Sequence, residues 1–393
     1  MKGVKLTGIL IVLLVITTGC WNMKEIQNIS YVTAIGFDYD DGKYIVYLQL
    51  IDFSSVAKLE GQQKAKEAPV WVGKGTGASF TEAVNHLYET SQQRVFWGHV
   101  SALVFSEPIL KQNKFQDVMD LLNRYREIRY LVWVFSTKES IENIFNSTPF
   151  FNESPMMSIL HSPEEPYRQR SIIPPIRLYQ FVMTLKEAAR MTYLPSLRIE
   201  KNQWEVSRKT HPFLEYAGIT VFWNNRYHGE LDPDDLHGLP WLHKKTVRVP
   251  LSLERGKSLA AVLVMEKPKV RIRPSVQDLR VYFDVELTVK AGINELHQEM
   301  SEKELIDLAE RKIEEQIRHT YRKGFERKVD VYSLGESLFR RYPTVWHRIE
   351  DENHFVLHED SLRNIRIHVQ LTNTGRYKLK PSQALMLKIP IFK

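Results

Sequence analysis

One thiol is the most reactive group that the sequence offers. Cys20 is the only cysteine among the 393 residues, and it directly follows Thr17-Thr18-Gly19. Small residues here let a peptidase reach the backbone, and the thiol is a nucleophile that can accept a diacylglyceryl group. An aliphatic residue is usual where Thr17 stands, but Gly19 and Cys20 are the residues that this chemistry needs most. The pattern therefore predicts a lipidation site at Cys20.

The residues before Cys20 have the layout of an export signal. Lys2 and Lys5 form a basic start, and residues 6–16 are an apolar run with the length of a signal-peptide core rather than a membrane span. We therefore expect residues 1–19 to be a lipoprotein signal peptide and the acylated Cys20 to hold the chain on a lipid bilayer. Two alternatives stay open: a secretory signal followed by a chance cysteine, and an uncleaved membrane helix.

Two further motifs resemble ligand-binding loops, but each is incomplete. Asp38, Asp40 and Gly42 are similar to the start of an EF-hand, yet the glycine comes too early and the final glutamate is missing. The glycine-rich residues 73–77 could place a phosphate at a helix start, yet they match neither the dinucleotide nor the P-loop pattern. We expect a plain hairpin turn at the first motif and a tight turn at the second.

Five histidines and one charged cluster carry side chains that could take part in chemistry. His99 could be a general base, but no recognised nucleophile accompanies it, so we expect a structural role. Four more histidines lie close together in the sequence, at His211, His228, His237 and His243. Their spacing does not place two on one helix face, which disfavours a zinc site. Arg124, Glu127 and Arg129 are expected to form surface ion pairs, with a binding role left open. We predict no catalytic residue, metal or cofactor.

The pattern of apolar residues predicts mixed strands and helices in the first half. Strands are expected at 31–37, 44–51, 70–72, 100–105 and 130–135, the first two joined as a hairpin. Helices are expected after the Ser79–Glu82 capping box, at 115–122 and around 181–191. Residues 146–175 hold several prolines and are expected to be a loop or linker.

The second half predicts a hairpin over 218–231, a short helix at 232–235 and long strands near 258–270 and 279–289. A helix capped by Ser301 and Glu304 follows, and its apolar stripe could lie on a membrane but is better suited to packing on a sheet. A helix at 332–340 and a strand at 365–371 complete the pattern. The polar interval 201–212 is the best domain boundary, which predicts domains 20–205 and 206–393, the second divided further near 250–300.

Composition limits the class of partner. The chain is 43% hydrophobic and 26% charged, which is enough apolar material for packed cores. Its net charge of +7 would suit nucleic acid or an anionic membrane, but the cations alternate with acids and form no basic arm. We therefore expect a membrane surface and no nucleic acid.

Taken in order, several short motifs resemble the Ger(x)C family, the lipoprotein C subunits of spore nutrient-germinant receptors. They run from 19–25 and 34–38 through Gly98-His99 and 328–331 to Thr374-Gly375. The match covers nearly all of the mature chain, and it departs from the family pattern at Thr17 and at Tyr125, where an acid is usual.

The resemblance implies a multi-domain α+β fold with mixed sheets and packed helices. It also implies a non-enzymatic receptor subunit on the outer face of the spore's inner membrane, working with integral-membrane A and B subunits. It leaves direct binding of a small nutrient open. The competing classes are a solute-binding lipoprotein of a transporter and a lipid-anchored hydrolase.

Overall fold

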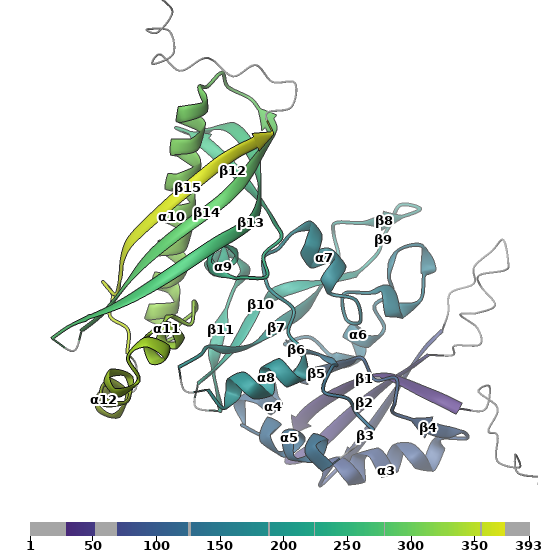
Figure 1. Cartoon of the computed structure of the whole chain (residues 1–393). Helices are drawn as coiled ribbons and strands as arrows, with labels where there is room; N and C mark the ends of the chain where they lie inside the picture. The colour runs from purple at the N-terminus through teal and green to yellow at the C-terminus, as the bar shows by residue number, and fades with distance from the viewer. Residues whose placement is uncertain are drawn as a thin grey trace, which may run out of the picture.

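The computed structural model describes residues 29–51, 69–124, 127–187, 189–223, 225–278, 280–353 and 356–373. Its strands form two large sheets and one two-stranded sheet. Figure 1 shows the first large sheet, built from residues 29–231, beside the second, built from residues 248–373, with helices packed against both. The expected multi-domain α+β architecture with mixed sheets is confirmed.

The first sheet has the strand order β11-β10-β7-β6-β5-β1-β2-β3, and β4 pairs with the start of β1. Its strands are β1 (Ile29–Asp40), β2 (Lys43–Ile51), β3 (Val70–Gly77), β4 (Arg94–Phe96), β5 (Ala102–Ser106), β6 (Trp133–Thr137), β7 (Thr192–Glu200), β10 (Phe213–Trp223) and β11 (Arg226–Leu231). The central strands β1, β5, β6 and β7 run parallel, and antiparallel pairs flank them on both sides. Parallel neighbours need crossover connections, and helices between these strands supply them.

The predicted hairpin at the start of the chain is confirmed. β1 and β2 pair antiparallel up to Asp40 and Lys43. Asp41 and Gly42 between them both have positive φ angles, of 45° and 74°. That is the geometry of a two-residue hairpin turn whose twist matches that of the strands.

Helices cover both faces of the first sheet and create two cores. α3 (Phe80–Thr90), α4 (Glu107–Lys111), α5 (Phe115–Arg124) and α8 (Leu178–Leu185) bury their apolar sides against one face. α6 (Ile141–Phe145) packs on the other face, where Ala34, Phe135 and Leu197 lie. Alternate residues of the strands therefore serve two different cores.

Two predictions in this half need correction. The helix expected around 181–191 is α8, which ends at Leu185, and the missed strand β7 begins at Thr192. Pro195 within β7 weakens the strand pattern, because proline removes a ladder donor. Residues 146–175 are not a linker: they contain η2 (Phe150–Asn152), η3 (Pro155–Met157) and α7 (Glu164–Gln169), and they bury Leu160 and His161.

The second sheet has the order β12-β13-β14-β15, with β14 and β15 parallel. Its strands are β12 (Arg248–Arg255), β13 (Ser258–Gln277), β14 (Arg280–Leu296) and β15 (Leu362–Asn373). β13 and β14 are longer than the sequence pattern predicted, and β12 was missed although its burial alternates from Arg248 to Leu253.

The long helix α10 (Glu302–Glu326) packs on this sheet, and Leu305, Ala309, Ile313 and Ile317 on its apolar stripe are fully buried. The packing interpretation of this helix is therefore confirmed. Both hydrogen bonds of the Ser301–Glu304 capping box are present. α11 (Leu334–Arg341) and α12 (Pro343–Asn353) follow, and α12 was not predicted.

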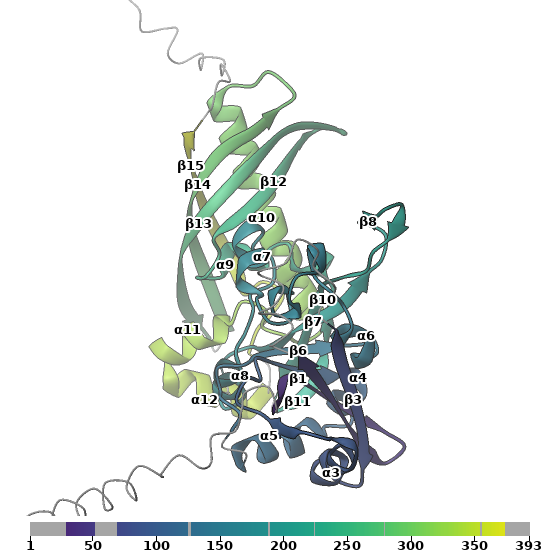
Figure 2. The ribbon, with the colours of Figure 1, turned by 90° about the vertical axis from the view of Figure 1, so that its right-hand side faces the viewer.

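A small apolar core joins the first sheet to short segments of the second half of the chain. In this core, the short elements η4 (Pro233–Leu236) and α9 (Leu239–Leu242) pack together with β10 and β11 and with residues 329–331. Figure 2, turned by 90°, shows the second sheet rising above the first, and the two-stranded hairpin β8 (Glu205–Val206) and β9 (Lys209–Thr210) extending away from the body.

The predicted domain boundary falls on that hairpin. β7 before it and β10 after it are antiparallel neighbours, so the first sheet continues through to Leu231. The second sheet begins at Arg248, close to the further division expected near 250–300. The division of the chain at residue 206 stays a prediction.

Candidate functional site

The predicted lipidation site lies outside the described residues. Cys20, Thr17 and the whole of the expected signal peptide precede Ile29, where the description begins. Within the described ranges, no helix is both long and apolar enough to cross a membrane. The anchor at Cys20 therefore stays a prediction from the sequence.

The acidic residues of the first hairpin serve the turn and its neighbour. Asp38 accepts a hydrogen bond from the Tyr39 backbone N–H at 2.8 Å and another from the Ser106 hydroxyl. Ser106 is the N-cap of α4, so Asp38 connects β1 to the start of that helix. Asp40 closes the turn opposite Lys43. This arrangement agrees with the plain hairpin that we expected.

The glycines at 73–77 lie in a strand, so the predicted turn there was wrong. β3 runs through to Gly77 and pairs with β2 along its length. A Cβ atom at Gly75 would lie 2.0 Å from the Ala83 carbonyl oxygen of α3. These glycines let the helix lie directly on the strand, which is a packing role.

The side chains of His99 and Arg124 also contact neighbouring residues of the fold. The exposed ring of His99 lies edge-on to Tyr31, with 5.0 Å between ring centroids. Arg124 pairs with Asp120 one turn earlier on α5, at 3.0 Å, rather than with Glu127. Both side chains of this pair are largely exposed, so the pair contributes little to stability.

The structure separates the four clustered histidines. Three of them contact different groups: His211 lies at Thr148, His228 at the Arg327 carbonyl oxygen and His237 at Asp234. His243 contacts the Lys245 backbone N–H through its Nδ1. Among the described residues, no group of three histidine, cysteine or acidic side chains is placed to hold a metal ion.

We take as the candidate site the larger of two cavities at the junction of the two sheets, because segments from both halves of the chain converge there. It has a volume of about 120 Å³, and four segments line it. Residues 174–184 and 190–193 come from the first sheet and α8, and residues 239–245 and 331–333 come from the second half. Ser333 accepts a hydrogen bond from the Met191 backbone N–H at 3.1 Å, which ties the two halves together at the cavity wall.

Basic groups line this cavity without an acidic partner among the lining residues. Arg190, His243 and Lys245 face it together with polar groups of Gln180 and Tyr193. Burial, with Lys245 and Arg190 nearby, lowers the pKa of His243 to about 4, so this imidazole is neutral at pH 7. Arg190 forms ion pairs with Glu187 at 3.5 Å and Glu336 at 3.6 Å, outside the cavity lining.

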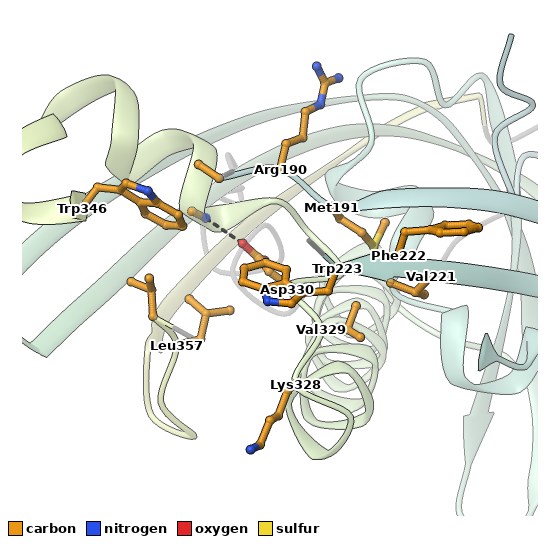
Figure 3. A pocket seen from close by; sticks show the side chains of 13 residues that line it. Arg190, Met191, Val221, Phe222, Trp223, Lys328, Val329, Asp330, Trp346 and Leu357 are labelled. Carbon is orange, nitrogen blue, oxygen red and sulfur yellow. Dashed lines mark hydrogen bonds between the residues drawn. The ribbon is translucent and has the colours of Figure 1, made fainter. Parts of the chain in front are cut away.

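A smaller cavity of about 20 Å³ adjoins it and shares Arg190 and Met191. Figure 3 shows Asp330 at its centre, with Trp346 and Leu357 opposite, while Arg190 and Lys328 point out of it in opposite directions. Asp330 accepts a hydrogen bond from the Gly335 backbone N–H at 2.7 Å. Its other carboxyl oxygen is shielded from solvent and has no hydrogen-bond partner among the described residues.

Burial raises the pKa of Asp330 to about 6, against the opposing effect of backbone N–H groups of Gly335, Leu334 and Tyr332. Gly335 is required here, because a Cβ atom would lie 2.7 Å from the Trp346 ring. Among the residues that line the two cavities, none forms a nucleophile–base pair, and the polar groups there suit a very small polar molecule. No sequence pattern pointed to this site, because its walls come from segments far apart in the chain.

Comparison with known protein families covers most of the chain. Residues 22–199 match the family model described as the spore germination protein N-terminal domain. Residues 217–375 match the model described as spore germination B3/GerAC-like, C-terminal. The gap between the two models contains the β8–β9 hairpin.

Full-length relatives give the same result. The chain is 24% identical to spore germination protein KC of Bacillus subtilis (strain 168) over 364 residues, which span 88% of this chain and 89% of the relative. It is 20% identical to spore germination protein B3 of the same organism over 365 residues, 89% of this chain and 92% of the relative.

A solved structure shares the fold. The crystal structure of the GerBC protein superposes with a TM-score of 0.55 and 12% sequence identity, covering 89% of this chain and all of that one. The two family models match one after the other along the chain, and the relatives and the solved structure each cover 88–89% of it. The chain therefore belongs to the Ger(x)C family of spore germination proteins.

Proposed function

We propose that this chain is the lipid-anchored C subunit of a nutrient germinant receptor and acts without catalysis of its own. Acylated Cys20 holds the folded body on the outer face of the spore's inner membrane, beside integral-membrane A and B subunits. The observation that carries the proposal is the extent of the family match, which begins two residues after Cys20 and reaches residue 375.

Replacing Cys20 with Ala tests the anchor. Because two acyl chains hold a protein durably and no other cysteine is present, Cys20→Ala should move the chain from the membrane fraction to the soluble fraction. Germination through the cognate receptor should fail with it. Thr17→Leu restores the usual residue of the motif and should leave both properties intact. Normal membrane retention and germination of the Cys20→Ala strain would refute the anchor.

The junction cavity is small for the solute-binding alternative. A solute-binding lipoprotein encloses its ligand between two lobes, in a pocket of about 300–1,000 Å³. The cavity of about 120 Å³ has room for a few waters or a very small molecule. Calorimetry of the mature chain with candidate amino acids and sugars should give no heat of binding, whereas a solute-binding protein would bind one of them directly.

A further inference from the structure

A cluster of exposed apolar side chains lies on the projecting hairpin and the irregular segment beside it. We call Phe150, Phe151, Trp204 and Val206 the aromatic tip. Their exposed fractions are 42%, 87%, 51% and 58%. The Phe150 ring contacts Phe151 and Trp204, with centroids 5.9 Å and 4.8 Å away, and rests on Phe213 at 4.3 Å. Large apolar side chains grouped in this way on a surface mark an interaction site.

Phe151 is the most informative member of the tip. Its φ angle of 59° is in the left-handed region, which is unfavourable for a bulky residue. Its ring is almost fully exposed, so folding gives it no compensating burial. A strained backbone that presents an apolar ring to solvent supports a role for the ring outside the folded body.

The shape and charge of the region favour a bilayer as its partner. Figures 1 and 2 both show the β8–β9 hairpin standing out from the molecule, so this hairpin is placed to meet a flat surface such as a bilayer. Within the hairpin itself, residues 205–210, Arg208 and Lys209 stand against one acid, Glu205. Ser207 and Arg208 at the turn both have positive φ angles, which makes a tight turn and places cations at the end of the hairpin.

We propose that the aromatic tip inserts into the interfacial layer of an anionic bilayer and gives the chain a second membrane contact besides Cys20. Tryptophan and phenylalanine rings enter that layer readily, and nearby lysine and arginine side chains meet the anionic headgroups. Over the whole region, Glu153, Glu200 and Glu205 balance the charges of Lys201, Arg208 and Lys209, so the positive charge is confined to Arg208 and Lys209 at the turn of the hairpin. The proposal rests on the proposed function for the presence of a membrane next to the chain.

The first experiment measures vesicle binding without the acyl anchor. The mature chain, residues 20–393 with Cys20→Ala, is floated with vesicles of phosphatidylglycerol and phosphatidylcholine, and with vesicles of phosphatidylcholine alone. We expect binding to the anionic vesicles that weakens about tenfold or more in the Phe151→Ala and Trp204→Ala variants. Trp71→Ala is the matched control, because Trp71 is 66% exposed on β3 outside the tip, and it should bind like the parent chain.

The second experiment reports the position of the tip. The Cys20→Ala chain contains no cysteine, so Phe151→Cys on that background can be labelled at one site with an environment-sensitive dye. The dye should shift its emission to the blue on addition of anionic vesicles. The same dye at Trp71→Cys should not shift.

Three outcomes would overturn the proposal: no binding of the parent chain to anionic vesicles, equal binding of all variants, or equal dye shifts at both positions. If the tip variants keep vesicle binding but fail to recover integral-membrane receptor subunits from detergent extracts, the surface binds protein and the membrane assignment is wrong. Circular dichroism checks that each variant is folded. Failure of the anchor proposal is read separately, from the Cys20→Ala strain, because the vesicle assay uses chains that are never acylated.

Discussion

His161 shows how one polar side chain fixes an irregular segment onto a sheet. Its Nε2 lies 2.9 Å from the Gln49 side-chain oxygen, and its Nδ1 lies 2.6 Å from the Ser101 hydroxyl. Gln49 in turn donates to the Phe145 carbonyl oxygen at 2.8 Å. Because every buried polar group here has a partner, the segment that the sequence suggested as a linker is held against the first sheet.

Replacing His161 with Phe should lower the free energy of unfolding at pH 7.5 by about 2 kcal/mol, since two hydrogen bonds of about 1 kcal/mol each are lost. Gln49 and Ser101 each keep a contact with Thr33, which limits the cost. Urea denaturation followed by circular dichroism measures the change in the free energy of unfolding. His99→Phe, at an exposed ring, should change stability by less than about 0.5 kcal/mol. Equal effects of the two variants would contradict the role of the network.

His161 should also make the stability of the fold depend on pH. Burial lowers the pKa of His161 to about 3, so between its ordinary pKa of 6.5 and 3 the folded chain binds fewer protons than the unfolded chain. The contribution of His161 to the free energy of unfolding is therefore fully present above pH 6.5 and is lost as the pH falls toward 3. At pH 5 about 2 kcal/mol should be gone, so wild type and His161→Phe should then be nearly equal in stability.

At the scale of elements, the contact between β3 and α3 depends on glycine. Gly75→Ala would place a Cβ atom 2.0 Å from the Ala83 carbonyl oxygen, a rigid backbone atom. We expect the free energy of unfolding to fall by about 1–3 kcal/mol, because the helix must move away from the strand. Gly73→Ala is the matched control on the same strand, since its Cβ would meet only the movable Leu87 side chain at 3.0 Å. Thermal unfolding of both variants checks the difference, and a cost at Gly73 equal to that at Gly75 would disprove the steric explanation.

Elements with strong local signals were predictable, and those without were not. The Asp41-Gly42 turn and the capped, amphipathic α10 depend on residues within a few positions of one another. β7 and β12 were missed, because each contains a proline that weakens the strand pattern, and their pairing partners in the sheets compensate for it. The turn at Gly73–Gly77 was wrong because glycine in a strand can also mean close packing, which only the position of α3 reveals.

At the scale of the whole molecule, Asp330 makes the stability of the junction between the two halves depend on pH. The ordinary carboxyl pKa of 3.8 rises to about 6 on burial, so between these values the folded chain binds more protons than the unfolded chain. The contribution of Asp330 to stability therefore decreases as the pH rises from about 4 to 6. Asparagine has the same shape but no charge, so at position 330 it avoids this loss of stability with rising pH.

Asp330→Asn should thus gain stability relative to wild type between pH 4 and pH 7, by up to about 3 kcal/mol. Urea denaturation at the two pH values measures the change. Asp284→Asn is a control of opposite sign: burial would raise the pKa of Asp284, but hydrogen bonds from Arg363 and Asn364 outweigh it and lower the pKa. That variant should lose stability relative to wild type as the pH rises through the carboxyl range. A gap between Asp330→Asn and wild type that is independent of pH would show that the carboxylate is not under strain.

The sequence by itself determined the export pattern ending at Cys20, the first hairpin, the long capped helix and the family resemblance. These signals are local in the chain or depend only on the order of short motifs. Tertiary structure alone decided the junction cavities and the aromatic tip. Arg190, Asp330 and Trp346 come from distant segments, and so do Phe151 and Trp204. Burial, exposure and pKa arise from which segments pack together, and no short-range pattern of residues encodes that.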